Sequence, residues 1–199
     1  MITKLSKNIS ELFINKEVIH AEDREVYEYS FELLISSIIS LIIITVGAII
    51  TGTILYTVFY LLGFIPLRLV AGGYHAKNHL RCIFILIITY ITFVLISHFI
   101  PNNYMVIVIL SCITASVVLV FIIAPSEDAN KPLTITEIMK FKKKSRYIII
   151  VMVAIIGLLI IIISNNKIAF SMTMGVLTVS VSLLANRIKQ MLLRKKYIV

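Results

Sequence analysis

A short segment of the chain holds most of the residues that could carry out chemistry. Residues 68–82 contain two of the four histidines, His75 and His79, and one of the two cysteines, Cys82. The same segment carries three basic residues and a glycine pair, and no Asp or Glu lies between residues 33 and 126. Because polar groups next to long apolar stretches are costly to desolvate, their concentration here indicates a function.

A thiol and an imidazole are the minimal set for nucleophilic catalysis by cysteine. The thiolate attacks, and a neighbouring imidazole promotes its formation by accepting the thiol proton. The positive charges of Arg68, Lys77 and Arg81 would further favour the anion. We therefore interpret Cys82 as a candidate nucleophile.

The spacing of the two histidines separates them as candidate bases. His79 precedes Cys82 by three residues, so a single helical turn would bring the two side chains together. His75 precedes it by seven residues and on a straight helix would lie roughly 10.5 Å away along the axis. Contact with His75 requires a non-helical segment, for which Gly72 and Gly73 supply backbone freedom. Spacing alone therefore favours His79.

The same residues allow a metal-binding alternative. His75, His79 and Cys82 are zinc-ligand types at helical spacing, and a fourth ligand would have to come from elsewhere. We rank this zinc-dependent enzyme below the thiol mechanism because no carboxylate or further cysteine stands close in the sequence. The preferred interpretation needs no metal and no cofactor.

The composition places the chain in a membrane. Of its 199 residues, 59% are hydrophobic and 15% are charged, and the mean hydropathy is +1.01. Soluble domains have roughly 45–50% apolar and about 25% charged residues. These values exclude a soluble globule, a disordered chain and a disulfide-stapled secreted domain. We expect an all-α integral membrane protein whose second cysteine, Cys112, lies inside an apolar run.

The apolar runs predict six transmembrane helices in a single membrane domain, 1–199. The uncharged stretch 33–67 would be about 52 Å long as one helix, too long for one span, so we divide it near Gly52. The predicted spans are 33–50, 53–67, 83–100, 104–124, 148–163 and 168–186. Residues 68–82 form the predicted catalytic loop between the second and third spans.

The basic residues determine the expected orientation. The net charge is +9, but alternation of six spans places eighteen of the nineteen basic residues on one side. By the positive-inside rule both termini and both long loops are cytosolic. Contact with anionic lipid explains the charge more simply than nucleic acid does. We predict no nucleic-acid partner.

Two segments are expected to lie on the membrane surface. Residues 1–32 show apolar positions near helical spacing, including Leu12 and Phe13, with charges between them, as in an amphipathic interfacial helix. Residues 133–147 combine apolar and many basic residues and would be attracted to anionic lipid.

The central motif also resembles a known family. The run Arg68…Gly72-Gly73-Tyr74-His75…Cys82, between the second and third of six spans in a chain of about 200 residues, resembles the accessory gene regulator protein B family. Those proteins are bacterial membrane cysteine endopeptidases that process quorum-sensing propeptides. The family pairs a catalytic His and Cys at this seven-residue spacing, which implies His75 and Cys82 as the catalytic residues here and overrides the preference for His79.

The resemblance implies a reaction and its partners. Cys82 would cleave an amphipathic, AgrD-like propeptide with His75 as base and then acid, releasing an acidic tail. The resulting thioester would be captured within the peptide, giving a thiolactone or lactone. Arg68, Gly72 and Gly73 match family positions as structural or substrate-orienting residues.

The chain's remaining supporting roles and assembly are weaker expectations. Asn78 and His79 are candidates to support the site, Asn78 by orienting His75. The small residues Ser36, Ser37 and Ser40 offer a face on which two copies could pack as a homodimer.

A non-enzymatic small peptide transporter or exporter is the other alternative. Transporters usually place ionisable residues within spans, and His98 is the one such candidate here, near the outer end of its span. Replacing Cys82 with Ala should leave a transporter active and inactivate a peptidase.

Overall fold

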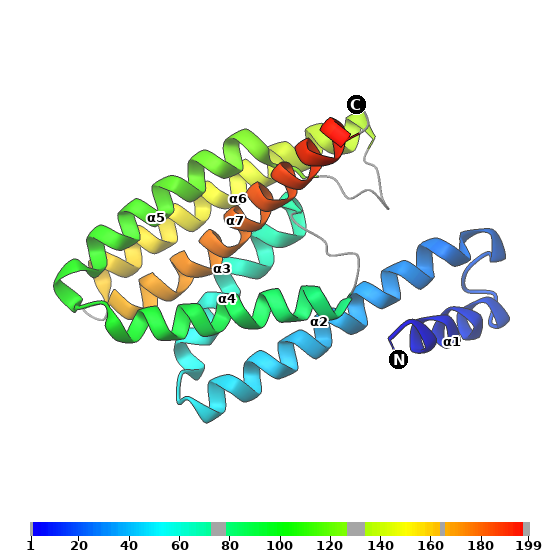
Figure 1. The fold of residues 1–199 in the computed structure, drawn as a ribbon, viewed down its shortest axis with the longest axis horizontal. Coiled ribbons are helices and arrows are strands. Elements are labelled where there is room, and N and C mark those ends of the chain that lie inside the picture. Colours follow the sequence, from blue (N-terminus) through cyan, green and yellow to red (C-terminus); the bar gives the residue numbers. More distant parts are fainter. Residues whose placement is uncertain (1, 73–78, 127–133, 164–165, 197–199) are drawn as a thin grey trace. The chain divides into compact units, whose positions relative to one another are not determined.

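The chain is helical throughout the part that the structure describes (Figure 1). The computed structural model describes residues 2–72, 79–126, 134–163 and 166–196, with the side chains of 79–83 and 193–196 outside this description. The elements are α1 (Ile2–Asn15), the 3₁₀ turn η1 (Ala21–Asp23), α2 (Arg24–Ile50), α3 (Ile54–Ala71), α4 (His79–Phe99), α5 (Asn102–Ile123), α6 (Ile135–Ile162) and α7 (Asn166–Lys196). Among these residues there is no β-strand, and a single isolated bridge joins Gly72 to Ser126.

The helices confirm the expected all-α membrane class. Among the described residues, α2, α3, α5, α6 and α7 are long and apolar enough to cross a membrane, and α4 contains a shorter apolar stretch, Phe84–Phe99. Large apolar side chains point outward from these helices: Ile50 is 79% exposed, Ile122 76% and Ile161 81%. Water would penalise such a surface, whereas hydrocarbon does not.

The helix ends agree with the predicted break between the first two spans and differ from several other predicted limits. Residues 51–53 separate α2 from α3, as expected. However, α6 begins at Ile135, well before the predicted span 148–163, and α7 runs on to Lys196. Thr134 caps α6 in a capping box with Glu137, so the helix begins at a local helix-start signal in the basic segment. A helix ends where its backbone bonding ends, and hydropathy does not report that position.

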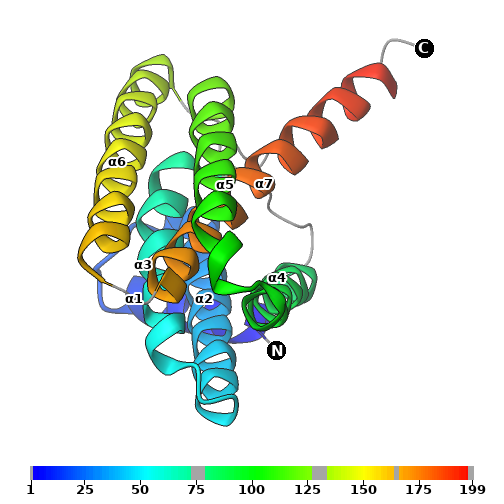
Figure 2. The ribbon, with the colours of Figure 1, turned by 90° about the vertical axis from the view of Figure 1, so that its left-hand side faces the viewer.

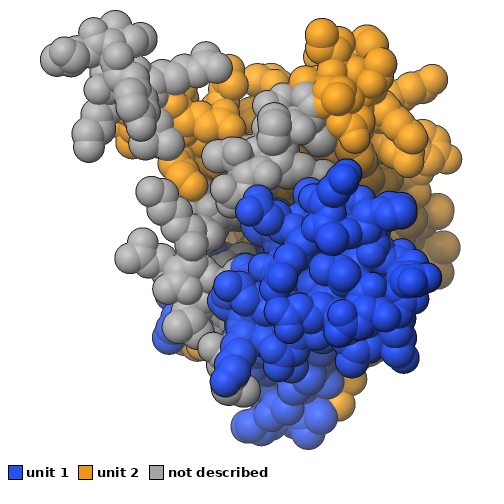
Figure 3. Space-filling view, turned by 90° about the vertical axis from the view of Figure 1, so that its right-hand side faces the viewer, with its two compact units in different colours: residues 1–51, 76–90 blue, residues 52–75, 91–199 orange. Residues whose placement is uncertain are grey.

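The described chain divides into two compact units (Figure 3). Unit 1 comprises Met1–Thr51 and Ala76–Tyr90, and unit 2 comprises Gly52–His75 and Ile91–Val199. The two halves of α4 therefore belong to different units.

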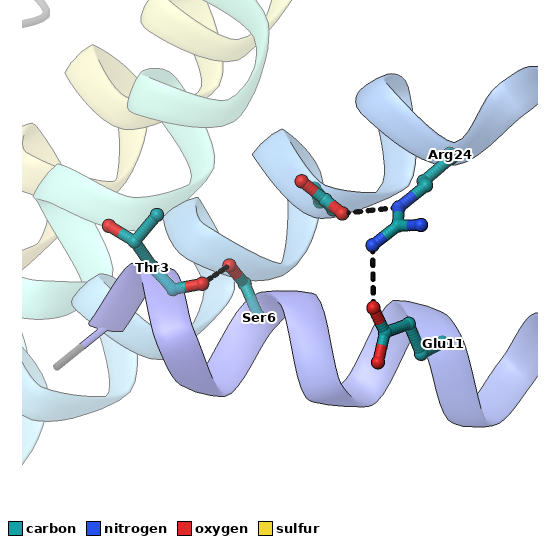
Figure 4. A network of polar contacts seen from close by, with 5 residues as sticks. Thr3, Ser6, Glu11 and Arg24 are labelled. Atoms are coloured by element: carbon teal, nitrogen blue, oxygen red, sulfur yellow. Dashed lines mark hydrogen bonds and ion pairs between the residues drawn. The ribbon is translucent and has the colours of Figure 1, made fainter.

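Unit 1 is built on a hairpin of α1 and α2. Ser6 and Ser10 are buried, which is typical of small residues at a close helix contact. The Arg24 guanidinium lies 2.7 Å from a carboxylate oxygen of Glu11 on α1 and 2.7 Å from one of Glu28 on α2 (Figure 4). Leu12 on α1 is exposed, and the segment 1–32 predicted as an interfacial helix is divided, because α1 ends at Asn15 and α2 begins at Arg24.

The predicted dimer face on α2 is partly covered within the chain itself. Ser36 and Ser40 are buried, and the hydroxyl of Ser40 donates to the carbonyl of Ser36 at 2.8 Å. Ser37 is exposed. A second copy would therefore meet Ser37 and its exposed neighbours rather than the whole stripe.

In unit 2, α7 is the central helix. It packs against α3, α5 and α6 (Figure 2). Within its most apolar stretch, 61% of the residues are buried. At the crossing of α3 and α7 the two backbones come very close: a Cβ on Gly63 would overlap the carbonyl of Met172, and a Cβ on Gly175 would overlap that of Tyr60. Two glycines thus set the depth and register of this crossing.

An aromatic cluster lies beside the crossing. The Tyr60 ring stacks on Phe93 with a centroid distance of 5.1 Å, and Phe93 contacts Phe170 at 6.3 Å. The Tyr60 hydroxyl donates to the Thr178 hydroxyl at 3.1 Å. The buried ring therefore also has a partner for its polar end.

Candidate active site

The segment 68–82, predicted as a loop, is helical at both ends. Arg68 lies in the last turn of α3, which ends at Ala71, and the backbone of Cys82 lies in the first turn of α4, which begins at His79. The prediction of a continuous loop was wrong at these two ends, because the helices extend beyond the apolar residues. Gly73, His75 and Asn78, and the side chains of His79 and Cys82, lie outside the described residues.

Gly72 ends α3 in a conformation that favours glycine. Its φ is +74° and its ψ is −141°, and its N–H donates to the carbonyl of Arg68 at 3.2 Å. A Cβ at this position would also overlap the carbonyl oxygen of Ser126. Both the backbone angle and the close neighbour therefore require a residue without a side chain. This is the first of the predicted site residues for which the structure supplies a physical reason.

Arg68 links the C-terminal end of α3 to α7 by hydrogen bonds. Its Nη1 donates to the carbonyl of Gly72 at 2.8 Å and to the hydroxyl of Ser182 at 2.8 Å. The side chain is partly buried, and the two oxygens provide acceptors for a cation at this depth. Arg68 therefore fixes the position of the backbone at Gly72, where the chain leaves α3.

Ser126, which follows α5, contacts the same backbone at Ala71 and Gly72. Its N–H donates to the carbonyl of Ala71 at 2.9 Å, and it forms the parallel bridge with Gly72. Its hydroxyl accepts a hydrogen bond of 2.6 Å from Nδ2 of Asn186 on α7. Polar contacts thus link the C-terminal ends of α3 and α5 to the C-terminal part of α7. In the sequence, the end of α3 lies immediately before the predicted catalytic residues.

These contacts also define the directions of the helices in unit 2. The C-terminal parts of α3, α5 and α7 meet at one end, where Arg68, Ser126 and Asn186 lie. Near the start of α6, Arg146 donates to the carbonyl of Phe121, close to the end of α5, at 3.2 Å, so α6 runs the opposite way. Alternation of six spans requires this arrangement of the second, fourth, fifth and sixth spans.

Positive charge gathers along the first turns of α6. The Arg146 guanidinium lies 5.0 Å from the centre of the Phe121 ring, a cation–π contact that holds it against α5. Exposed lysines precede it on the helix: Lys140, Lys142, Lys143 and Lys144. The end of unit 2 at which Gly72 lies is therefore positively charged.

Sequence reasoning missed three members of this site: Ser126, Ser182 and Asn186. Ser182 and Asn186 are four residues apart on α7, and Asn186 is only 6% exposed. A polar pair at helical spacing within an otherwise apolar run is a signal that could have indicated an inward-facing polar stripe. Nothing in the sequence could have paired Asn186 with Ser126, which lies 60 residues earlier.

Metal ligands do not gather in the part of the chain that the structure describes, where no group of three or more His, Cys, Asp or Glu residues could hold an ion. The zinc alternative rests on His75, His79 and Cys82, whose side chains lie outside that part.

The fold defines a polytopic helical membrane protein, whose sequence carries His75 and Cys82 between α3 and the apolar part of α4. The family comparison is more specific: the model of AgrB, accessory gene regulator B, matches residues 2–183. The chain belongs to this family, whose role is accessory gene regulator quorum-sensing peptide processing and which implies an AgrD-like propeptide substrate. Searches of curated proteins and of solved structures found no match.

Proposed function

We propose that the chain is a membrane cysteine endopeptidase that cleaves the C-terminal tail from a quorum-sensing propeptide and promotes its cyclisation. Cys82 is the nucleophile and His75 the general base and then acid. The proposal rests on the family membership and on one structural observation: α3 ends at Ala71, and Gly72, three residues before His75, leaves the helix with a φ of +74°.

The seven-residue spacing between His75 and Cys82 limits how the two side chains can meet. On one straight helix the two residues would be held roughly 10.5 Å apart along the axis. Since α3 ends at Ala71 and Gly72 has a φ of +74°, α3 does not continue toward His75. The choice of His75 over His79 as the base rests on the family membership.

The start of α4 suits a thiolate nucleophile. Cys82 lies in the first described turn of α4, and the dipole at the start of a helix favours negative charge. This is one of the environments that activates catalytic cysteines. Basic residues near the site add to the effect, and no Asp or Glu opposes it in the sequence from 33 to 126.

The reaction proceeds in two acyl transfers. Cys82 Sγ attacks the carbonyl carbon of the scissile peptide bond, and the C–N bond breaks as the imidazolium of His75 protonates the leaving amine. The thioester formed on Cys82 is then attacked by a thiol or hydroxyl of the same peptide, which releases Cys82 and closes the ring. Proximity within the bound peptide and exclusion of water favour ring closure over hydrolysis.

The positive charge near the site supports an acidic leaving tail. The lysines at the start of α6 and the bases around the motif would attract a negatively charged peptide segment. Together with the positive-inside distribution, this charge supports a site at the cytosolic face of a bacterial cell membrane, with both termini cytosolic.

Co-expression with a candidate propeptide tests the proposal. Mass spectrometry of the cell extract should show processed peptide with the wild type, and none with Cys82→Ser or His75→Ala. Cys112→Ser is the matched control, because it removes the other thiol, on α5, and should keep processing. His79→Ala should lower processing without abolishing it, because His79 is expected to support the site and not to act as the base.

Three results would contradict the proposal. Processing that survives Cys82→Ser excludes the thiol mechanism, and accumulation of intact peptide in vesicles by that variant indicates a transporter. Processing that is lost with His79→Ala but kept with His75→Ala shows that the base is wrongly assigned. Reversible loss of activity in a chelator, restored by Zn²⁺, supports the metal enzyme instead.

A further inference from the structure

We infer that Ser126 and Asn186 are positioning residues that hold the backbone from which the general base of the proposed peptidase extends. The inference rests on the proposed function, since it concerns the same site. It assigns a role to two residues, on the exit from α5 and on α7, that neither the motif nor its spacing includes.

The pair is a polar contact in an apolar setting. Asn186 is 6% exposed, and its Nδ2 lies 2.6 Å from the Ser126 hydroxyl oxygen. A buried amide without partners is costly, so a helix in an apolar bundle retains one where it makes specific contacts. Here the contact joins α7 to residue 126, three residues after the end of α5.

Ser126 transmits this contact to the catalytic segment. Its N–H donates to the carbonyl of Ala71 at 2.9 Å, and it bridges Gly72 in parallel. Its carbonyl oxygen occupies the space that a Gly72 side chain would need. The backbone at Gly72 is therefore held between Ser126 and the Arg68 side chain, which donates to the Gly72 carbonyl at 2.8 Å.

Gly72 precedes His75 by three residues, and three residues of extended chain span at most about 11 Å. A shift of the Gly72 anchor therefore shifts the range that the imidazole can reach. Errors of about 1 Å in the placement of catalytic groups cost on the order of 100-fold in rate. The closest approach of α7 to α3 lies elsewhere, at Gly63 and Gly175, and does not include the Ser126–Asn186 pair.

The experiment measures the reactivity of the Cys82 thiol and its dependence on His75, and it needs no peptide substrate. In a Cys112→Ser background Cys82 is the single thiol of the full-length protein. Its alkylation by iodoacetamide, followed by mass spectrometry from pH 5 to 9 in membranes, reports the fraction of thiolate. Pairing with an imidazole sustains alkylation at low pH, whereas an ordinary thiol with a pKa of about 8.5 is mostly protonated there.

His75→Ala sets the reference for complete loss, and we expect alkylation at pH 6 to fall by about 100-fold. Ser126→Ala and Asn186→Ala should each lower it by about 10-fold at pH 6 and leave the rate at pH 9 unchanged. The double variant should be no slower than the slower single one, because both changes remove the same contact.

Two variants control for general disruption. Ser126→Thr keeps the hydroxyl and should retain the wild-type profile. Ser180→Ala removes another buried hydroxyl from α7, one that donates to the Val176 carbonyl at 3.0 Å, and should also have no effect. Thermal unfolding in detergent establishes that each variant is folded, and Ser126→Ala is the smaller change if Asn186→Ala is not.

The outcomes separate this inference from the proposed function. If His75→Ala leaves the profile unchanged, the proposed catalytic pair is wrong. If His75→Ala shifts the profile but folded Ser126→Ala does not, or slows alkylation equally at every pH, the positioning role is wrong. A shift in Ser126→Ala that Ser126→Thr reverses supports it.

Discussion

At the residue scale, Gly72 combines two constraints that usually occur separately. Its φ of +74° lies in the region that side chains disfavour, and the Ser126 carbonyl occupies the position of a Cβ. Placing an L-residue in such a backbone conformation costs about 1–3 kcal/mol, and the overlap with backbone cannot be relieved by rotating a side chain. The chain offers a comparison at Gly52, whose φ is +66° but whose Cβ would meet nothing within 4 Å.

We therefore expect Gly72→Ala to abolish propeptide processing while the protein still inserts into the membrane. The added methyl group must displace Ser126 and with it the start of the catalytic segment. Processed peptide measured by mass spectrometry, normalised to membrane-bound protein, gives the result. Gly52→Ala also places a side chain at a positive φ, but without the backbone overlap, and should keep most of the activity. Equal activity of the two variants would refute a role for the Gly72–Ser126 contact.

At the element scale, the crossing of α3 and α7 sets which side chains can meet. Gly63 and Gly175 let the two backbones touch, and each helix then runs on to its contact, α3 to Arg68 and α7 to Ser182. Larger side chains at the crossing would separate α3 from α7 and move Arg68 away from the Ser182 hydroxyl. Membrane helices, which gain little from apolar burial in lipid, depend on such close packing for association.

Gly175→Ala should destabilise the fold by about 1–3 kcal/mol, the usual cost of overpacking. The new methyl group would overlap the Tyr60 carbonyl and approach the Phe64 N–H, both part of a rigid helix. Thermal unfolding in a mild detergent measures the effect.

Gly157 on α6 is the matched control for this change. A Cβ there would meet nothing within 4 Å, so Gly157→Ala should stabilise its helix by about 0.5–1 kcal/mol through helix propensity alone. Unchanged stability of Gly175→Ala would show that α3 and α7 are not as close as described.

At the scale of the whole molecule, the charge distribution and the helix directions agree. The C-terminal parts of α3, α5 and α7 meet at one end of unit 2, which alternation of six spans requires. The apolar outer surfaces of these helices define the part that faces lipid. The lysine-rich start of α6 and the basic end of α7 extend the same end with positive charge.

Single cysteines in a Cys82→Ser, Cys112→Ser background test this topology. On intact cells a membrane-impermeant maleimide should label cysteines placed at Thr51 and Asn103, which lie in the predicted outer connections. Cysteines placed at Lys7, Lys142 and Arg187 should react after permeabilisation alone, because the positive-inside rule retains these segments in the cytosol. Labelling of the latter group on intact cells would reverse the orientation.

The amino-acid sequence by itself determined the membrane class, the helical break near Gly52 and the motif from Arg68 to Cys82 that resembles the family. These features are local: hydropathy reports the transfer of each stretch out of water, and a motif is read from neighbouring residues. The limits of α6 and α7 were less well predicted, because capping and backbone bonding extend helices beyond their apolar residues.

The tertiary structure alone decided which distant residues support the motif. Ser126, Ser182 and Asn186 come to the end of α3 because Gly63 and Gly175 allow α3 and α7 to cross at backbone contact. Hydrogen bonds between residues 60 to 114 positions apart depend on the depth and register of that crossing. Such a register arises from packing between helices, for which a single helix's periodicity carries no information.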